Sequence, residues 1–298
     1  MAEEKTTEKR AACVIGYPAE HSRSPLIHNY WIQQLGLNAE YRRESVSPED
    51  FPDFIAHLAD HGYVGANVTI PHKEAVMKLA RPDADAEALG AANTLWFEGK
   101  TLRATNTDVE GFLDSLDAQV PRWDSGLDNA MVLGAGGAAR AIVAGLKARH
   151  VREIRVANRT FGRAEALREK FGSSVLPTEW NEVNGILASA DLVVNTTSLG
   201  MVGQPPLELK MRALKPSTVI ADIVYAPLET QLLKGARERG LRTADGLGML
   251  LHQAVRGFFL WFGVKPQVTP ELRALVVADL TEMPKAQTET AKPSRKTE

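Results

Sequence analysis

Only one cysteine, Cys13, occurs among the 298 residues of the chain. A single thiol excludes an internal disulfide and a zinc site built from several cysteines, and it fits a reducing cytoplasm. The seven histidines show no HExxH or comparable spacing, so the sequence predicts no metal site. An excess of positive charge is lacking as well. The formal net charge is −2, which leaves no basic field to bind nucleic acid or an anionic membrane surface.

Long apolar runs are also missing. The run FFLWF at residues 258–262 is far shorter than the roughly 20 residues that span a bilayer, and we interpret it as part of a buried helix. Residues 1–10 are polar and lack the apolar core of a signal peptide, and no repeat of fixed period is present. With 44% hydrophobic and 24% charged residues, the composition predicts a cytoplasmic globular protein of about two domains.

What the chain does contain is an alternation of strands and helices, in two series. The first series predicts an α/β domain that includes a hairpin turning at residues 98–100. Its expected strands are 13–16, 40–46, 63–70, 93–97 and 101–105, and its expected helices open at Ser24-Pro25, at Ser47-Pro48, at Pro71 and at Asp108.

The second series restarts near Leu127, and its apolar strands predict a doubly wound sheet of the Rossmann type. These expected strands are 130–133, 153–157, 191–194, 218–223 and 241–243. Two helices, 248–262 and 270–283, close the chain with no strand between them, so we expect them to pack back onto the first domain. The polar stretch 284–298 is expected to be disordered.

Residues 67–73 (NVTIPHK) place polar side chains at the end of an apolar strand. Pro71 suits the first position of a helix, which would put Lys73 at the positive end of the helix dipole. Because that end disfavours a cation, stability gives no obvious reason for a lysine there, whereas proton transfer does. The alternative is an ordinary surface lysine.

Asp108 begins an expected helix, and taken singly it is better explained as an N-cap. Lys73 and Asp108 become a candidate catalytic pair only beside a dinucleotide-binding domain. Hydride loss from an alcohol requires a partner that takes the hydroxyl proton, and these are the two ionisable groups that we select for that role.

Such a domain is indicated by Gly134-x-Gly136-x-x-Ala139, which follows an expected strand and opens an expected helix. The first glycine permits a tight turn, the second lets the backbone approach a pyrophosphate, and the small third position allows close helix packing. Glycine-rich turns between strands and helices are common. The spacing supports dinucleotide binding here because an expected strand precedes it and an expected helix and a second strand follow it.

The second strand of this domain ends at Asn158, Arg159 and Thr160, with Arg163 shortly after. An NAD site would usually place Asp or Glu here to accept a hydrogen bond from the ribose 2′-hydroxyl. Arginine pairs bidentately with phosphate, so the residues present favour the 2′-phosphate of NADP. The alternatives are two solvated arginines near a helix start and Thr160 as a simple N-cap.

Four further polar residues have two interpretations each. Ser22 and Ser24 precede a helix, where their hydroxyls could bind a ligand or cap the helix, and capping is the default for Ser24. Gln253 lies in an otherwise apolar helix, where a buried amide needs a partner. Tyr225 fits a core or a pocket equally well.

Taken together, the chain from about residue 14 to 253 closely resembles the shikimate dehydrogenase family. Seven segments in the family's order carry the resemblance: 22–25 (SRSP), 67–73 (NVTIPHK), 90–94 (GAANT), 106–108 (NTD), 134–138 (GAGGA), 158–160 (NRT) and 246–253 (GLGMLLHQ).

The resemblance implies NADPH-dependent, reversible reduction of 3-dehydroshikimate to shikimate, in the chorismate pathway of aromatic amino-acid biosynthesis. It also implies a substrate-binding and catalytic domain at residues 11–108, completed by helices at about 247–283. An NADP-binding Rossmann domain at residues 109–246 would follow, with a cleft between the two domains whose closure brings hydride donor to acceptor.

The same resemblance implies the roles of single residues, with Lys73 and Asp108 as the catalytic pair. Shikimate is expected to contact that pair and Ser22, Ser24, Asn67, Thr69, Asn93, Tyr225 and Gln253. NADP is expected to contact Gly134, Ala135, Gly136, Gly137, Ala138, Asn158, Arg159, Thr160, Arg163, Ile223 and Gly246 and, more weakly, Asp85. Because shikimate is a carboxylate with three hydroxyls, hydroxyl and amide partners suit it.

Two alternatives stay open. One is a quinate/shikimate dehydrogenase that prefers NAD, against which Arg159 and Arg163 argue. The other is a non-catalytic NADP-sensing protein, which the loss of Lys73 or Asp108 would have favoured. The sequence does not determine the oligomeric state, and a homodimer is one candidate.

Overall fold

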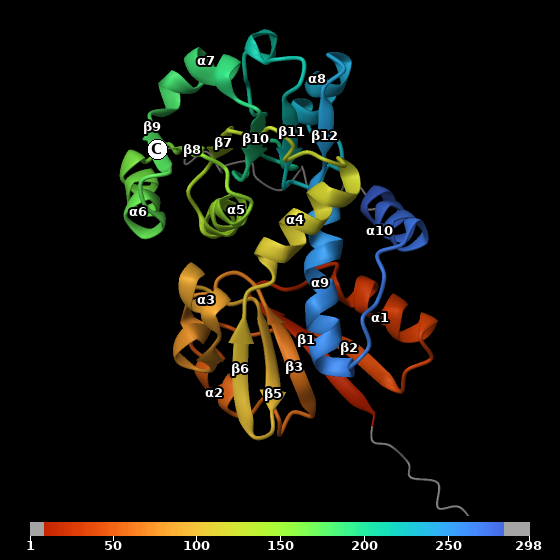
Figure 1. Ribbon diagram of the computed structural model, residues 1–298. Coiled ribbons are helices and arrows are strands. Elements are labelled where there is room, and N and C mark those ends of the chain that lie inside the picture. The colour runs from red at the N-terminus through yellow and green to blue at the C-terminus, as the bar shows by residue number, and fades with distance from the viewer. Residues whose placement is uncertain (1–8, 283–298) are drawn as a thin grey trace, which may run out of the picture.

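The computed structural model describes residues 9–282, so the predicted disordered tail at 284–298 lies outside the described residues. The described chain forms two lobes, each built around a six-stranded sheet. Two helices, α4 (Asp108–Gln119) and α9 (Gly246–Phe262), run between the lobes (Figure 1). The predicted fold class, two α/β domains of which the second is doubly wound, is confirmed.

The first lobe is built from the N-terminal elements. These are β1 (Arg10–Gly16), α1 (Ser24–Gln34), β2 (Ala39–Ser45), α2 (Phe51–Ala56), β3 (Tyr63–Val68), η1 (Ala75–Lys78), β4 (Arg81–Pro82), α3 (Ala84–Leu89), β5 (Thr94–Glu98) and β6 (Thr101–Thr105). The strand order is β2-β1-β3-β5-β6-β4. β1 pairs in parallel with β2 and β3, whereas β5 pairs antiparallel with β3 and β6. The sheet is therefore mixed.

Helices cover both faces of this first sheet. Successive side chains of a strand point to opposite faces, so Cys13 and Ile15 of β1 enter one core while Val14 enters another. The first core is closed by α2, η1 and α3. The second is closed by α1, α9 and the last helix, α10 (Pro270–Glu282). The C-terminal helices therefore return to the first domain, as predicted.

The second lobe follows from residue 129 onward. Its elements are β7 (Asn129–Leu133), α5 (Gly137–Ala148), β8 (Glu153–Ala157), α6 (Phe161–Phe171), β9 (Val175–Thr178), η2 (Trp180–Glu182), α7 (Val183–Ile186), η3 (Leu187–Ser189), β10 (Leu192–Asn195), η4 (Met211–Ala213), β11 (Val219–Asp222), α8 (Gln231–Glu238) and β12 (Arg242–Ala244). All its ladders are parallel, in the order β12-β11-β10-β7-β8-β9. Counted from β7, this is the 3-2-1-4-5-6 order of dinucleotide-binding folds.

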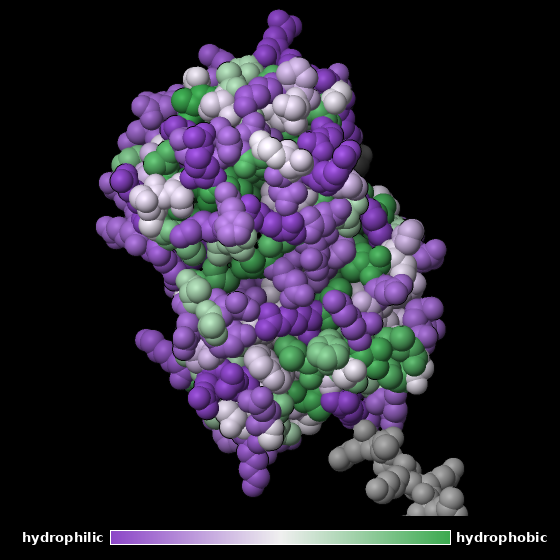
Figure 2. Space-filling view, in the orientation of Figure 1, coloured by the Kyte–Doolittle hydropathy of each residue, from purple (hydrophilic) through white to green (hydrophobic). Residues whose placement is uncertain are grey.

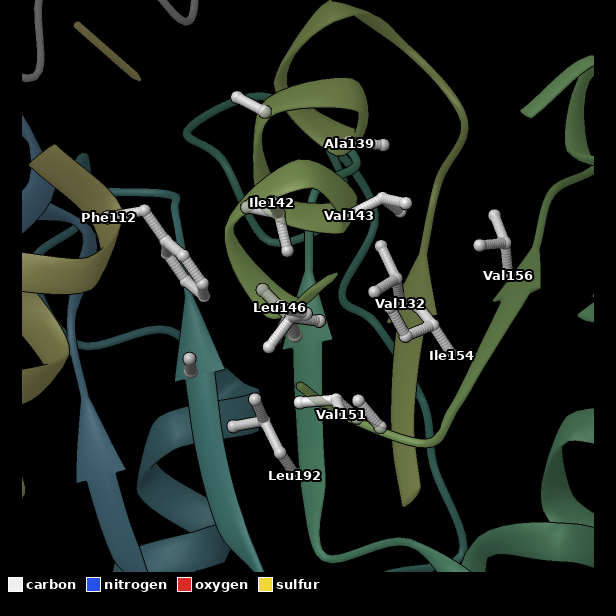
Figure 3. Close-up of a cluster of buried hydrophobic side chains, with 14 of the residues drawn as sticks. Phe112, Val132, Ala139, Ile142, Val143, Leu146, Val151, Ile154, Val156 and Leu192 are labelled. Atoms are coloured by element: carbon white, nitrogen blue, oxygen red, sulfur yellow. The ribbon is translucent and has the colours of Figure 1, made fainter. Parts of the chain in front are cut away.

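The core on one face of this sheet lies under α5. Ile142, Val143 and Leu146 of α5 pack toward Val132 of β7 (Figure 3). Phe112 of α4 is buried in the same cluster. Since α4 begins beside the first sheet, it anchors both lobes.

The pairing of α4 with α9 depends on glycine. A Cβ added to Gly111 of α4 would lie 2.5 Å from the Cβ of Gln253 on α9, and one added to Gly248 of α9 would collide with Ser115 of α4. Gln119 at the end of α4 also donates to the Asp245 carbonyl and accepts from its N–H, both at 3.1 Å. These contacts hold α4, which leads from the first lobe to the second, against α9, which returns to the first lobe.

The predicted helix at Pro71 is wrong. Residues 70–74 form turns that lead into the short η1. The buried His72 ring holds this segment, because its Nε2 lies 2.8 Å from the Val46 carbonyl oxygen and the ring stacks on Phe51 with centroids 4.0 Å apart. Lys73 therefore does not lie at the dipole of an α-helix, and that argument for its function is lost.

Three short elements have no prediction from the sequence. β4 has two residues and α3 has six, which is too short for a periodic pattern to be recognised. β9 contains Pro177, which a sheet tolerates at its edge, and β9 is the edge strand. Within residues 9–282, none of the helices has both the length and the apolar character needed to cross a membrane.

Candidate active site

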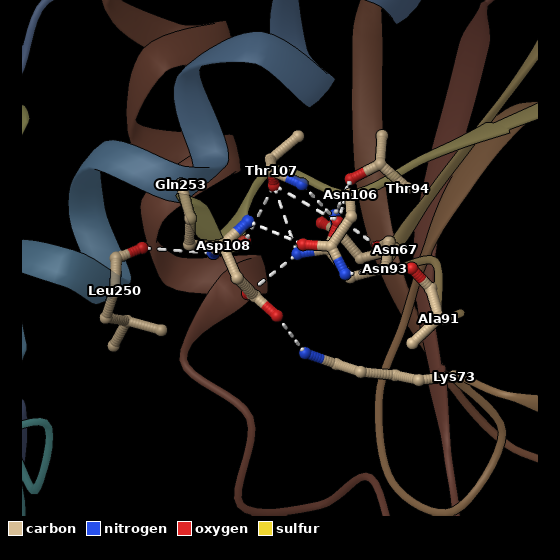
Figure 4. A network of polar contacts seen from close by, with 10 residues as sticks. All are labelled: Asn67, Lys73, Ala91, Asn93, Thr94, Asn106, Thr107, Asp108, Leu250 and Gln253. Atoms are coloured by element: carbon tan, nitrogen blue, oxygen red, sulfur yellow. Dashed lines mark hydrogen bonds and ion pairs between the residues drawn. The ribbon is translucent and has the colours of Figure 1, made fainter. Parts of the chain in front are cut away.

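Lys73 and Asp108, far apart in sequence, meet at the top of the first sheet. Lys73 Nζ lies 2.6 Å from Asp108 Oδ2, and the two side chains are 30% and 12% exposed (Figure 4). Asp108 is the first residue of α4, and Lys73 lies in the turn after β3. The Ala92 N–H donates to the Lys73 carbonyl at 2.9 Å, which fixes that turn beside the segment leading into β5.

The Asp108 carboxylate is held by its neighbours before any ligand arrives. Asn93 Nδ2 donates to Asp108 Oδ1 at 2.8 Å, so one carboxylate oxygen faces an amide and the other faces Lys73. The Asp108 N–H donates to Asn106 Oδ1 at 2.9 Å, and Asn106 Nδ2 donates to the Ala91 carbonyl at 2.9 Å. The structure thus brings Asn93 to the Lys73–Asp108 pair, whereas Asn106 supports the Asp108 backbone and is not among the residues predicted from the sequence.

Asn67 and Gln253 join the same network from two other elements (Figure 4). Asn67, near the end of β3, donates to Thr94 Oγ1 at 3.1 Å. Gln253 of α9 accepts from Thr107 Oγ1 at 3.5 Å and donates to the Leu250 carbonyl at 3.1 Å. The amide of Gln253 therefore has the hydrogen-bond partners that it needs in an apolar helix. Thr94 and Thr107 also belong to this network, but neither is among the site residues predicted from the sequence.

The two serines and Thr69 lie at the ends of neighbouring elements. Ser24 is the first residue of α1, whose N-cap is Arg23, so the interpretation of Ser24 as the N-cap is wrong. The Ser24 N–H donates to Ser22 Oγ at 3.3 Å. Thr69 follows β3, and its N–H donates to the Ile15 carbonyl at 2.9 Å. The Ser24 side chain is therefore not used for capping and can serve a ligand.

Tyr225 comes from the second lobe but packs against the core between α1 and α9. Burial raises the pKa of its phenol, and the positive charge of Arg23 acts in the opposite direction. Arg23 itself pairs with Asp279 of α10 at 2.6 Å. The structure places Tyr225 against this core, and its contact with a substrate stays a prediction.

A buried carboxylate, Asp222, fixes the segment that carries Ile223 and Tyr225. It accepts hydrogen bonds from Asn195 Nδ2 at 2.9 Å, Thr230 Oγ1 at 2.7 Å and the Val224 N–H at 3.0 Å. Burial raises its pKa, while these bonds oppose the rise. Asp222 is not among the residues predicted from the sequence, where the only signal for it is an acidic residue at the end of an apolar strand.

The glycine-rich turn after β7 has the geometry of a phosphate loop. Gly134 has φ +110°, a region that favours glycine, and its N–H donates to the Ala157 carbonyl at 2.7 Å. A side chain added at Gly136 or Gly137 would meet open space. The first turn of α5 contains no acidic residue and no side chain caps it, so its N–H groups are free to bind an anion.

The arginines after β8 are placed for a second anion. Arg159 and Arg163 are exposed, and neither forms an ion pair with any residue in the range 9–282. Thr160 takes the N-cap position of α6, but its side chain makes no capping bond. Asn158 Nδ2 donates to the Thr160 carbonyl at 2.8 Å, which orders the turn. These residues fit the 2′-phosphate of NADP.

Three expected cofactor contacts have structural partners of their own. Asp85 of α3 pairs with Arg256 of α9 at 3.1 Å. Gly246 begins α9 so close to the Ile223 carbonyl that any Cβ would collide with it. Contacts of Asp85, Ile223 and Gly246 with a cofactor stay predictions, because packing and ion pairing already explain these residues.

The candidate catalytic pair lies on the side of the first lobe that meets the second lobe. Glu74, next to Lys73, pairs with Arg140 of α5 at 2.8 Å, so the Lys73 turn lies against the helix that follows the phosphate loop. Figure 2 shows the waist between the lobes, where apolar side chains reach the surface among polar ones. A doubly wound domain with an open phosphate loop, set beside a lysine–aspartate pair, defines a two-domain nicotinamide-dependent dehydrogenase.

Comparison with known families narrows this class. Residues 14–95 match the shikimate dehydrogenase substrate binding domain, residues 119–224 match shikimate / quinate 5-dehydrogenase, and residues 246–275 match the shikimate 5′-dehydrogenase C-terminal domain. The chain belongs to the shikimate dehydrogenase family.

Its relatives include proteins named shikimate dehydrogenase (NADP(+)). One from Rhodopseudomonas palustris (strain BisB18) is 60% identical over 274 residues, which cover 92% of this chain and 99% of the relative. One from Nitrobacter hamburgensis is also 60% identical over 274 residues, covering 92% and 96%.

Similar solved structures share the fold over both lobes. Quinate dehydrogenase from Corynebacterium glutamicum in complex with NAD has a TM-score of 0.85 and 31% identity, covering 91% of this chain and 99% of that one. Shikimate 5-dehydrogenase from Thermus thermophilus in complex with NADP(H) and shikimate has a TM-score of 0.78 and 32% identity, with the same coverage.

Proposed function

We propose that the chain catalyses the NADPH-dependent, reversible reduction of 3-dehydroshikimate to shikimate, a step of aromatic amino-acid biosynthesis by way of chorismate. The observation that carries this proposal is the 2.6 Å contact between Lys73 and Asp108, surrounded by amide and hydroxyl groups and facing the dinucleotide-binding lobe. The relatives at 60% identity are named for this reaction.

The polar groups around the pair suit a substrate with several hydroxyls. Asn67, Asn93 and Gln253 supply amides, and Ser22, Ser24, Thr69 and Tyr225 supply hydroxyls. We infer that the serines, which flank Arg23, and Tyr225 bind the substrate carboxylate, since hydroxyl groups can donate hydrogen bonds to it. The amides near Asp108 would bind the hydroxyls, because amide groups can both donate and accept.

In this proposal the protein transfers a proton to the ketone oxygen of the substrate, and the ketone carbon receives a hydride from the cofactor. NADPH, when bound, supplies the hydride for the ketone carbon. Lys73, as an ammonium, donates a hydrogen bond and then a proton to the ketone oxygen, which becomes the hydroxyl of shikimate. Asp108 orients the same oxygen and stabilises the ammonium before transfer. In the reverse direction the pair accepts that proton.

The cofactor residues support NADP over NAD. The free N–H groups at the start of α5 suit the pyrophosphate. The guanidinium groups of Arg159 and Arg163, which have no ion-pair partner among the described residues, suit a 2′-phosphate. No acidic side chain ends β8 to accept a hydrogen bond from a ribose 2′-hydroxyl. For the same reason, the alternative of a quinate dehydrogenase with NAD preference is not favoured.

The division of labour between the lobes is part of the proposal. We infer a substrate-binding and catalytic domain at residues 11–108 with helices from about 247, and an NADP-binding domain at 109–246. The two sheets and the return of α9 and α10 to the first lobe support this division. A homodimer and a cytoplasmic location stay predictions.

Initial rates test the proposed function directly. Shikimate and quinate are each oxidised with NADP and with NAD, and NAD(P)H formation is followed by absorbance. The expected order places shikimate with NADP first by at least about tenfold in kcat/KM. A higher kcat/KM for quinate with NAD would contradict the proposal. A chain that binds NADP but oxidises neither substrate would be the NADP-sensing alternative.

A further inference from the structure

We infer that Tyr41 is a positioning residue for the substrate, because its buried hydroxyl donates a hydrogen bond to the side chain of Asn67. The inference rests on the proposed function, since Asn67 is a proposed substrate contact. Tyr41 belongs to none of the segments that carry the family resemblance. It acts through Asn67 and is not itself a catalytic residue.

Tyr41 and Asn67 are joined by a short hydrogen bond. Tyr41 lies on β2 and Asn67 on β3, and β1 separates these strands in the sheet. The Tyr41 ring therefore reaches across β1, and its hydroxyl donates to Asn67 Oδ1 at 2.6 Å. Both side chains are buried, with Tyr41 3% and Asn67 6% exposed. A bond of this length between buried groups fixes the amide orientation of Asn67.

The remaining atoms of the Asn67 amide are also occupied. Its Nδ2 donates to the Asn93 carbonyl at 3.2 Å and to Thr94 Oγ1 at 3.1 Å. An amide nitrogen has two hydrogens, so both are used within the protein. An oxygen has two lone pairs, of which Tyr41 takes one. Asn67 can therefore offer a substrate only one acceptor site, and a hydroxyl of the substrate is the group that suits it.

The Tyr41 hydroxyl is available as a donor toward Asn67. Burial raises the pKa of Tyr41 well above its ordinary value, so the phenol stays protonated.

Packing holds the Tyr41 ring in place. The ring stacks on His28 with centroids 4.2 Å apart and at an angle of 17°, and Trp261 lies 5.7 Å away. Removal of the hydroxyl alone would keep these contacts. Tyr41→Phe therefore separates the positioning role of the hydroxyl from the packing role of the ring.

Tyr41→Phe is compared with wild type and with Tyr63→Phe as a matched control. Tyr63 is also a buried tyrosine of the first sheet, but its hydroxyl bonds Glu44 and its ring faces the opposite core. We expect Tyr41→Phe to raise KM for shikimate about tenfold and to leave KM for NADP within about twofold. Tyr63→Phe should leave both constants near the wild-type values.

Substrate analogues supply a readout that a loss of stability would not produce. Dissociation constants for shikimate and for three analogues, each lacking one hydroxyl, are measured by calorimetry without cofactor. In wild type, the analogue that lacks the hydroxyl bonded to Asn67 should bind much more weakly than shikimate. In Tyr41→Phe the ratio of the two dissociation constants should shrink several-fold for this analogue only. Because each ratio is taken within one preparation, partial unfolding of the variant does not change it.

Three results would overturn the inference. These are an unchanged KM for shikimate in Tyr41→Phe, equal changes in Tyr41→Phe and Tyr63→Phe, and analogue ratios that all match wild type. If Tyr41→Phe gives no folded protein, Thr94→Val removes an acceptor from the same amide and the analogue comparison is repeated on it. Failure of wild type to oxidise shikimate with NADP would instead refute the proposed function.

Discussion

The two halves of the site differ in how far they are organised without ligand. Around Asp108 the polar groups already bond one another, since Asn93, Asn106 and Lys73 each hold the carboxylate or its backbone. Around the start of α6, Arg159 and Arg163 are exposed and have no ion-pair partner within residues 9–282. The substrate half around Asp108 is a network of hydrogen bonds within the protein, whereas the cofactor half at the start of α6 has two arginines without ion-pair partners among the described residues.

This difference indicates two kinds of recognition. A network that fixes its own geometry can act on a reacting oxygen without reorganising, which favours turnover. Exposed guanidinium groups gain a partner only when an anion binds, which favours affinity and selectivity for one cofactor. Changes in the first half should therefore lower kcat, and changes in the second half should raise KM for the cofactor.

The largest effect is expected from Lys73→Ala. Without the ammonium, the ketone oxygen loses its proton donor, and kcat should fall by about a thousandfold or more. NADPH affinity, measured by fluorescence titration, should stay close to wild type because Lys73 lies in the first lobe. Turnover near the wild-type level would show that Lys73 has no role in the chemistry.

Asp108→Asn is expected to rank second. The amide can still face Asn93, but it presents an N–H instead of a carboxylate oxygen to Lys73. We expect kcat to fall by about a hundredfold with a smaller change in KM for NADP. Steady-state rates with both substrates varied check this. A change confined to KM for the cofactor would mean that Asp108 serves cofactor binding and has no role in proton transfer.

Arg159→Gln combined with Arg163→Gln tests the second half of the site. The loss of two phosphate partners should raise KM for NADP by roughly thirtyfold and leave kcat within about threefold. KM for NAD serves as the internal control and should hardly change, because NAD lacks the 2′-phosphate. Equal losses with both cofactors would refute the phosphate role.

A smaller effect is expected on the pH dependence of stability, through His28, which is buried in the core of the first lobe. Burial lowers the pKa of His28 to about 3, and its ring nitrogens have no hydrogen-bond partner in the part of the chain described. An unfolded chain protonates His28 below its ordinary pKa of about 6.5. Native protein cannot do so until near pH 3, so stability contributed by the neutral ring is complete above pH 6.5 and is lost as pH falls.

His28→Phe isolates this contribution. Between about pH 6 and pH 4, wild type should lose up to about 1.4 kcal/mol of unfolding free energy per pH unit relative to the variant. Urea unfolding at several pH values measures the difference, and groups common to both proteins cancel. Parallel pH curves would mean that His28 is protonated without cost.

The sequence predicts the second lobe better than the first. The segment from β7 through the glycine-rich turn to α5 and β8 has strong local signals, because a tight turn and a helix start require particular residues. The turn that carries Lys73 has a misleading signal. Pro71 suits a helix start, but the contacts of His72 with Val46 and Phe51, residues distant in sequence, determine its conformation.

The site shows the same limit. Lys73 and Asp108 could be selected because each is ionisable and stands at the end of an element. Tyr41, Asn106 and Asp222 could not, since their importance comes from neighbours on other strands and loops. Tyr41 looks like an ordinary strand aromatic until the sheet order places it across β1 from Asn67. Side chains that position other side chains are visible only in the folded molecule.

The most direct measurement is a crystal structure of the chain with shikimate and NADP bound together. We predict that Lys73 Nζ and an Asp108 carboxylate oxygen both lie within hydrogen-bonding distance of one shikimate hydroxyl, whose carbon faces the nicotinamide ring. A complex in which shikimate binds away from this pair, or in which the two side chains separate and turn from the nicotinamide, would contradict the account.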